Sequence, residues 1–495
     1  MNLITLEIAV VILAIAILLG DLWTPAPQKR QLGYAAAFGL ILIFIFSFLA
    51  PPPSGLAFNN MFVIDGLALF FKRFFIAAAI IVLFIAIEFA ERIEHGISEF
   101  YSLILFALAG MMFAASANDF ILVFVALELV SVTFYILNSF QRDRLGSLEA
   151  GIKYLILSAL SAAFLVFGIA FIFGTTTFTN FFEIRSLLTR SPELVTQPAF
   201  ILGILFVMVG LGFKIAAFPF QIWAPDVYQG SPAPATAFLA VGSKAAGIVL
   251  LLRVLFTAVP QVAVHWDKLL IGLSAITILY GNLCAIPQRN LKRLLGYSSI
   301  ANAGYLLLGF AALNETGFSA ILYYLCGYLF AVLAAFMVIT LVTRERESDD
   351  ISVLAGLNQR SPLLAACMTL AMVSLPGIPP LAGFFGKFLL LKAVVEQGAK
   401  NSAYYWLVGI AILGVVISLY YYFGVIRAIY WSKEPTDLSP IQISISAKIV
   451  LLVCAAGMLY LGIFPNKPVE QTQLATQVLQ INVSSIKIPP TASHP

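Results

Sequence analysis

The chain has 495 residues, of which 61% are hydrophobic and only 11% are charged, and its mean hydropathy is +0.99. A soluble protein of this size does not need so much apolar surface, so the composition excludes that class. The formal net charge is +4, but no basic patch interleaved with aromatic residues lies outside the expected loops, which gives no support to nucleic-acid binding.

Long apolar runs recur along the whole chain, and each can cross about 30 Å of hydrocarbon as a helix. The sequence therefore predicts an all-α polytopic membrane protein with about fourteen transmembrane helices, and thirteen is also compatible with the pattern. The first run has neither a basic flank nor a small-residue cleavage site, which favours a retained helix over a cleaved signal. The spans are expected near residues 3–20, 33–50, 67–88, 100–117, 119–139, 150–174, 198–229, 233–258, 268–286, 297–313, 319–343, 362–396, 404–426 and 446–464.

Basic residues in the connecting segments gather on alternate sides of these spans. One side holds Lys29, Arg30, Arg92, Arg142, Arg144, Arg289, Lys292, Arg293, Arg344, Arg346, Arg360, Arg427 and Lys433. The opposite side holds mainly Arg185, Arg190, Lys268, Lys400, Lys467 and Lys487. The positive-inside rule makes the first side cytoplasmic, and an even number of spans then places both termini outside the cytoplasm.

Two of the expected spans are unusually long and are interrupted by proline. The span at 198–229 contains Pro219, and the span at 362–396 contains Pro379. Because proline removes a backbone hydrogen bond, it breaks or kinks a helix. Broken helices in matching positions indicate inverted repeats.

A lysine accompanies each break, and Lys214 and Lys387 lie five spans apart, as a five-helix inverted repeat requires. The match is imperfect, because helix 5 contains Glu128 and the equivalent helix 10 has no acid. We expect three N-terminal helices in 1–98, a first repeat of helices 4–8 in 99–258, a second repeat of helices 9–13 in 259–430, and a last helix with a polar extracytoplasmic tail in 431–495.

Four charged residues lie inside the apolar runs: Glu128, Lys214, Lys244 and Lys387. Burial of a charge in a membrane is costly, so such residues mark function. Desolvation moves the pKa of a buried lysine by about 3–5 units towards neutrality, and two charges about 8 Å apart interact by roughly 2 kcal/mol at an effective dielectric of about 20. This inventory favours a proton relay over a solute carrier or a channel.

Each of these charges also has a simpler interpretation. Glu128 can be a structural ion-pair partner for a lysine, which does not exclude a relay. The lysines can snorkel, but Lys214 and Lys244 lie too near mid-span for an easy reach to water. Lys392, nearer the end of its span, is expected to snorkel.

Glu149 and Lys153 lie one helical turn apart at the cytoplasmic start of span 6, after Ser147 as a possible N-cap. From the residues alone, two interpretations stay open. The pair is either an ordinary i,i+4 salt bridge or a group that passes protons to the buried lysines.

No cofactor or metal site is predicted in this chain. The four cysteines lie in apolar spans without a C-x-x-C pair, and the three histidines lie at unrelated spacings. The glycines at 210 and 212 lack the G-x-G-x-x-G spacing, and Gly386-Lys387 is not followed by Ser or Thr.

Several motifs are recognisable. The segment GFKIAAFPFQIWAPDVYQGSPAPATAFLAVGSKAAG at 212–247 resembles the antiporter-like subunits of respiratory complex I, and its WAPDVY and VGSKAAG pieces resemble the subunit N family in particular. Further matches follow in order over most of the chain, namely LEL at 127–129, LEAGIKY at 148–154, NLKRLLGYSSIA at 290–301 and GFFGKF at 383–388.

The resemblance implies roles for individual residues. The family's glutamate on helix 5 matches Glu128, its lysines on helices 7, 8 and 12 match Lys214, Lys244 and Lys387, and its pair at the start of helix 6 matches Glu149 and Lys153. Such a subunit is a proton-pumping module of the bacterial inner membrane, beside neighbouring antiporter-like and small membrane subunits. NADH, FMN, iron–sulfur clusters and quinone are bound by other subunits.

Three departures from the family pattern concern polar residues. Gln221 and Asn302 stand where histidine is common, and Gln229 stands where an acid is typical. Water held by these amides is the expected substitute. The runner-up is a subunit of a multisubunit cation/proton antiporter, and a third class is a structural subunit with degenerate charges.

Overall fold

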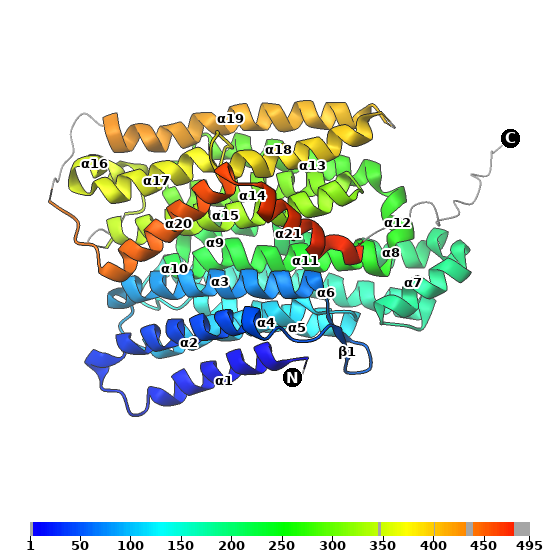
Figure 1. Cartoon of the computed structure of the whole chain (residues 1–495), viewed down its shortest axis with the longest axis horizontal. Coiled ribbons are helices and arrows are strands. Elements are labelled where there is room, and N and C mark those ends of the chain that lie inside the picture. The colour runs from blue at the N-terminus through cyan, green and yellow to red at the C-terminus, as the bar shows by residue number, and fades with distance from the viewer. Residues whose placement is uncertain (1–2, 345–347, 400, 432–438, 480–495) are drawn as a thin grey trace.

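The computed structural model describes residues 3–344, 348–399, 401–431 and 439–479. Its helices run side by side in one bundle, with the first three helices on one side and α19 on the opposite side (Figure 1). Within the described residues, twelve helices are long and apolar enough to cross a membrane, and two shorter apolar helices, Thr5–Gly20 and Pro362–Ser374, complete the predicted fourteen spans. The prediction of an all-α polytopic membrane protein is confirmed.

The N-terminal part contains three spans and one small hairpin that the sequence analysis did not predict. The spans are α1 (Thr5–Gly20), α2 (Arg30–Leu49) and α3 (Gly66–Phe89). Between α2 and α3, the antiparallel strands β1 (Gly55–Ala57) and β2 (Phe62–Ile64) pair with Leu56 opposite Val63.

The next five spans contain the first broken helix. They are α4 (Ile97–Ala115), α5 (Phe120–Asn138), α6 (Leu145–Thr176), the broken pair α8 (Pro198–Ile215) and α9 (Trp223–Gly230), and a continuous span of α10 (Ala233–Phe238), η4 (Leu239–Ser243), α11 (Lys244–Arg253) and η5 (Val254–Ala258). A further helix, α7 (Phe181–Arg190), lies at one end of the bundle and was not predicted (Figure 1).

The following spans contain the second broken helix. They are α13 (Asp267–Ala285), α14 (Leu291–Ala311), α15 (Glu315–Val342), the broken pair α17 (Pro362–Ser374) and α18 (Ala382–Gly398), α19 (Ala403–Trp431) and α20 (Ile445–Ile463). Short helices α12 (Pro260–His265) and α16 (Leu357–Arg360) connect spans.

The two sets of five spans pack in the same order. In the first set α4 packs on α5, and α6 packs on α8 and α9. In the second set α13 packs on α14, and α15 packs on α17 and α18. This recurrence agrees with the inverted-repeat interpretation, while the domain boundaries themselves stay a prediction.

Each break has a local backbone cause. The helix α8 ends at Ile215, the next residue Ala216 has a φ of 57° in the left-handed region, and Pro219 follows. The second break contains Gly377 with a φ of 96°, a conformation that glycine adopts at low cost, and Pro379 follows. Both interruptions predicted from proline are therefore present.

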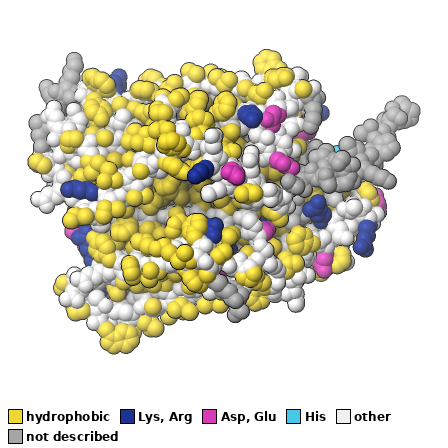
Figure 2. Space-filling view, viewed as in Figure 1, with side chains coloured by type: hydrophobic (Ala, Val, Ile, Leu, Met, Phe, Trp, Pro, Cys, Tyr) yellow, Lys and Arg dark blue, Asp and Glu magenta, His cyan; other side chains and the backbone are white. Residues whose placement is uncertain are grey.

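The polar segment after residue 466 was expected to be a tail, but its described part is helical. The helix α21 (Asn466–Thr476) packs against α3 and α15, and residues 480–495 lie outside the described part. Hydrophobic side chains dominate the face that carries α20 and α21, and charged groups are sparse on it (Figure 2). This surface suits hydrocarbon or other membrane proteins.

Two ion pairs hold the N-terminal helices, one between α3 and α1 and one between the start of α3 and α11. Lys72 of α3 is fully buried and lies 2.6 Å from Glu7 of α1. Asp65 caps α3 through the Ala68 N–H and pairs with Arg253 of α11 at 2.9 Å. Burial raises the pKa of Asp65, but the charge and hydrogen bonds of Arg253, the Ala68 N–H and the Lys72 charge together outweigh this and hold the pKa below its usual value.

Candidate functional site

Lys214 lies in the last turn of α8, just before the first break, and its side chain is buried. Its Nζ donates to Ser131 Oγ of α5 at 2.6 Å and to Ser158 Oγ of α6 at 3.2 Å. The Tyr154 ring lies beside it, 5.6 Å from Nζ. Neutral acceptors therefore surround this charge.

Lys387 lies in the half-helix that follows the second break and is also buried. Its Nζ donates to the Pro376 carbonyl at 3.1 Å and sits 4.0 Å from the centre of the Tyr305 ring. Residue 376 lies two positions after Ser374, the last residue of α17.

The two breaks hold their lysines by the same electrostatics. The last carbonyls of a helix have no intrahelical partner and carry partial negative charge, so they favour a cation. Lys214 belongs to the C-terminal turn of α8, and Lys387 reaches the carbonyl that follows α17. An ammonium group therefore lies near the C-terminal end of both α8 and α17, as at the ion sites of other broken transmembrane helices.

Lys244 lies at the first residue of α11, directly after the π-helical turn η4. Such turns are frequent at functional sites because they reposition side chains. Its Nζ donates to the Ser299 carbonyl at 2.5 Å and to the Ser299 hydroxyl. That hydroxyl also bonds the Tyr228 and Tyr328 hydroxyls, each at 3.1 Å.

The helix α14 continues this polar network towards Lys387. Next to Ser299, the Ser298 hydroxyl bonds Tyr422 and accepts from Asn302 Nδ2 at 3.4 Å. Tyr324 donates to Asn302 Oδ1 at 2.7 Å. One turn further along α14 is Tyr305, whose ring contacts Lys387, so polar groups of one helix extend from Lys244 to Lys387.

Glu128 lies in α5 and is half-buried at the edge of an apolar exposed face. Within the described residues it forms no ion pair with Lys214, although it lies near enough for its charge to act on that ammonium group. Glu128 and Lys214 are therefore neighbours without a direct contact, and serines make the direct contacts of Lys214.

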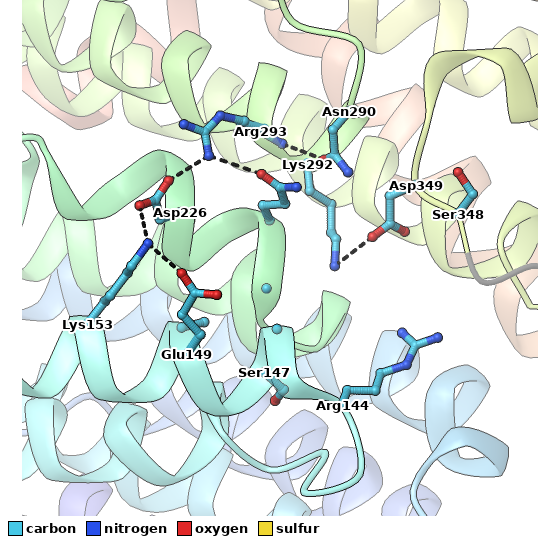
Figure 3. Close-up of a pocket in the computed structure, with 14 residues that line it drawn as sticks. Arg144, Ser147, Glu149, Lys153, Asp226, Asn290, Lys292, Arg293, Ser348 and Asp349 are labelled. Atoms are coloured by element: carbon cyan, nitrogen blue, oxygen red, sulfur yellow. Dashed lines mark hydrogen bonds and ion pairs between the residues drawn. The ribbon is translucent and has the colours of Figure 1, made fainter.

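The residues Glu149 and Lys153 line a pocket of about 650 Å³ at one end of the bundle (Figure 3). Lys153 Nζ lies 2.7 Å from Glu149 Oε1, as the i,i+4 interpretation predicts, and also 2.7 Å from Asp226 Oδ2 of α9. Asp226 Oδ1 in turn lies 2.6 Å from Arg293 of α14. Asp226 therefore joins α6 to α14.

The opposite wall of the pocket carries a second ion pair. Lys292 Nζ lies 3.0 Å from Asp349 Oδ2 and donates to the Ser231 carbonyl at 3.0 Å. Arg144 also lines the pocket, and Figure 3 shows it below Lys292 and Asp349. Alternating acids and bases around a hydrated pocket can hand protons to one another through water.

Sequence reasoning found the lysines but missed most of their partners. Asp226 was visible within WAPDVY, and the polar residues of α14 were visible in an otherwise apolar span. Of the three departures, Asn302 takes part in the α14 network and Gln229 accepts from Arg293 at 3.0 Å. Gln221 is buried, and its Oε1 has no partner among the described residues, which leaves an acceptor for water.

No group of three or more His, Cys, Asp or Glu side chains suited to a metal occurs in the described ranges. The cysteines at 284, 326, 367 and 454 are free thiols in or between helices. The groups that can exchange protons are therefore the lysines, carboxylates and hydroxyls described above.

Comparison with known proteins gives concordant results. The family described as NADH:quinone oxidoreductase/Mrp antiporter, transmembrane, matches residues 117–418. The chain is 38% identical to NADH-quinone oxidoreductase subunit N of Desulforamulus reducens, over 96% of this chain and 98% of the relative. It is 36% identical to F420H2 dehydrogenase subunit N of Methanosarcina mazei, over 96% of this chain and 98% of the relative. A chain of respiratory complex I from Thermus thermophilus with bound aureothin superposes with a TM-score of 0.78 at 32% identity, covering 94% of this chain and 99% of that one.

Proposed function

Because the chain belongs to the NADH-quinone oxidoreductase subunit N family of antiporter-like complex I subunits, we propose that Lys214, Lys244 and Lys387 relay protons through it. The chain is a multi-pass membrane subunit of that complex. Its contribution is then to move protons across the membrane in response to electron transfer in other subunits of the complex.

The observation that carries the proposal is how the three lysines are held. In the described residues their direct partners are serine hydroxyls and backbone carbonyls, not carboxylates. A lysine that gives up its proton in such a place leaves no buried anion behind. Deprotonation and reprotonation of each lysine therefore cost less free energy than they would in a buried ion pair.

The pocket around Glu149 and Lys153 supports a role in proton uptake. Its charged rim collects protons from one aqueous side, and Lys153 lies on α6, the helix whose Ser158 contacts Lys214. Glu128 would tune the charge on Lys214 from the adjacent helix α5. A change in a neighbouring subunit beside α5 would act on Glu128 first.

Polar groups lie along the proposed proton path from Lys214 towards Lys387. Tyr154 lies beside Lys214, and its buried hydroxyl has no hydrogen-bond partner among the described residues, so it is free to bond a water molecule on the way to Lys244. From Lys244, the hydroxyls and the Asn302 amide on α14 continue towards Lys387. Water molecules bridge the remaining gaps in this proposal, and Gln221 offers one free acceptor for them.

The redox chemistry belongs to other subunits in this proposal. Relatives carry names with NADH or F420H2 as the electron donor, so the donor varies while this membrane subunit keeps its form. NADH, FMN, iron–sulfur clusters and quinone would be bound elsewhere in the complex. We place the pocket end of the bundle in the cytoplasm, because its loops carry most of the Lys and Arg residues.

The test is the proton-to-electron ratio of the intact complex in proteoliposomes. Lys214→Met should lower proton pumping several-fold while electron transfer continues, so that the proton-to-electron ratio falls. Lys392→Met is a matched control, because the Lys392 side chain is 55% exposed and only lies near Glu396. If Lys214→Met and Glu128→Gln both keep the wild-type ratio, the relay assignment fails. Electron-independent exchange of Na⁺ for H⁺ would instead favour the antiporter alternative.

A further inference from the structure

We propose that the groove between the end of α19 and the turn joining α13 to α14 binds an anionic phospholipid. The groove has a volume of about 1000 Å³. It is lined by Arg289 and Arg427, by the aromatic residues Tyr420 and Trp431, and by Gly424 at its floor. This site is separate from the pocket of Figure 3 and does not depend on the proton relay.

The two arginines provide the charge that a phosphate group needs. Arg289 and Arg427 are exposed, and neither guanidinium has an ion-pair partner among the described residues. Asp350 also lines the groove, and one of its carboxylate oxygens caps the following turn by accepting from the Ser352 N–H. Guanidinium groups bind phosphate with two parallel hydrogen bonds, which favours a phosphate ester as the ligand.

The aromatic and apolar lining favours a lipid over a soluble anion. Tyr420 and Trp431 are 71% and 70% exposed on α19, one on each side of Arg427 along the helix. Such residues concentrate at the level of lipid headgroups. Ile286 and Phe423 add apolar surface beside the arginines. Basic pockets between transmembrane helices at the cytoplasmic side are suited to anionic headgroups with their acyl chains below.

Gly424 keeps the floor of the groove open. A Cβ placed on Gly424 would meet no atom within 4 Å. Glycine inside a helix costs roughly 1 kcal/mol relative to alanine, and no neighbouring element of this chain needs the space. A ligand that contacts the backbone of α19 at this position would explain why a residue without a side chain stands there.

The wall opposite α19 is fixed before any ligand arrives. The Ile351 N–H donates to the Arg289 carbonyl at 2.8 Å, and Asn290 forms an antiparallel bridge with Asp350. These contacts fasten the segment after residue 348 to the α13–α14 turn. Arg289 therefore projects from a braced turn, so little ordering is needed on binding.

The experiment uses the intact complex in nanodiscs that contain a photoactivatable phosphatidylglycerol, with labelled peptides mapped by mass spectrometry. We expect labelling within residues 420–431, displaced by unlabelled phosphatidylglycerol and far less by phosphatidylcholine. Replacing both arginines by glutamine should reduce this labelling by about tenfold or more, since each basic residue near an anionic headgroup contributes about fivefold in affinity.

A steric variant with matched controls separates the groove from general surface charge. Gly424→Leu fills the floor while both arginines stay, and it should reduce labelling as strongly as the arginine variant. Gly409→Leu makes the same change on the same helix at another position where a Cβ would meet nothing, and Arg142→Gln removes an exposed charge elsewhere. Both controls should label like the wild type. Equal labelling in all variants, equal labelling by phosphatidylcholine, or a neighbouring subunit that excludes the probe from this groove would overturn the proposal.

Discussion

Ser299→Ala is the substitution that should most sharply test the link between Lys244 and the α14 network. Every hydrogen bond of the Lys244 ammonium group among the described residues goes to an atom of Ser299. The alanine variant keeps the carbonyl and removes the hydroxyl. It also leaves the Tyr228 and Tyr328 hydroxyls without the partner that each has at 3.1 Å.

The size of the effect follows from the number and kind of bonds lost. A hydrogen bond to a charged group contributes about 1.5–3 kcal/mol, and a neutral one about 1 kcal/mol. Loss of the charged bond alone, at about 2 kcal/mol, would slow a step that needs charged Lys244 by roughly thirtyfold. Because water can partly replace the hydroxyl, we expect proton pumping to fall by about tenfold.

The assay is the initial rate of proton uptake into proteoliposomes, divided by the rate of electron transfer in the same sample. Ser274→Ala is the matched control, since Ser274 of α13 is equally buried but only donates to the Gly304 carbonyl of α14, at 2.8 Å. Both variants lose a buried hydroxyl between helices, but Ser299→Ala loses three hydrogen bonds and Ser274→Ala loses one, so the Ser299 variant should be the less stable of the two. Wild-type pumping in Ser299→Ala together with normal assembly would refute the assignment of Ser299 to the relay.

Three other predictions concern ion pairs. Glu7→Gln should destabilise the chain by about 3–5 kcal/mol by leaving Lys72 unpaired, and Glu7→Gln with Lys72→Met should recover much of the loss in a thermal unfolding assay. Asp226→Asn should change stability by only about 1 kcal/mol, because its partners are partly exposed, but proton uptake should slow, most clearly at low salt. Asp65→Asn should lower the melting temperature at pH 7. Because the pKa of Asp65 is held below its usual value in the folded chain, the ionised carboxylate stabilises the fold above about pH 4, and this stabilisation is lost on acidification. The difference in melting temperature between the variant and the wild type should therefore shrink towards pH 3. A melting-temperature difference independent of pH would contradict the last of these.

Much of the fold was predictable because membrane spans are specified by simple physics. Apolar run length predicted the spans, and proline predicted both broken helices. Boundaries were less well predicted where a helix begins with polar residues. The span expected from residue 297 starts at Leu291, because Lys292 and Arg293 belong to its first turn and bind acids outside it.

The candidate site was predictable only in part. A lysine in an apolar run is visible without a structure, but its partners come from distant segments. Ser131 and Ser158 are ordinary residues in sequence, and only packing brings them to Lys214.

The helix α14 holds an unusual combination of contacts. Near its start Lys292 and Arg293 bind Asp349 and Asp226, and further along it offers Ser299 to Lys244 and Tyr305 to Lys387. A displacement of this one helix by 1–2 Å, an ordinary amplitude for packed helices, would alter all four contacts together. Movement of α14 would then couple protonation in the surface pocket to protonation in the membrane interior. This mechanical coupling would add to the electrostatic effect of each charge on the next.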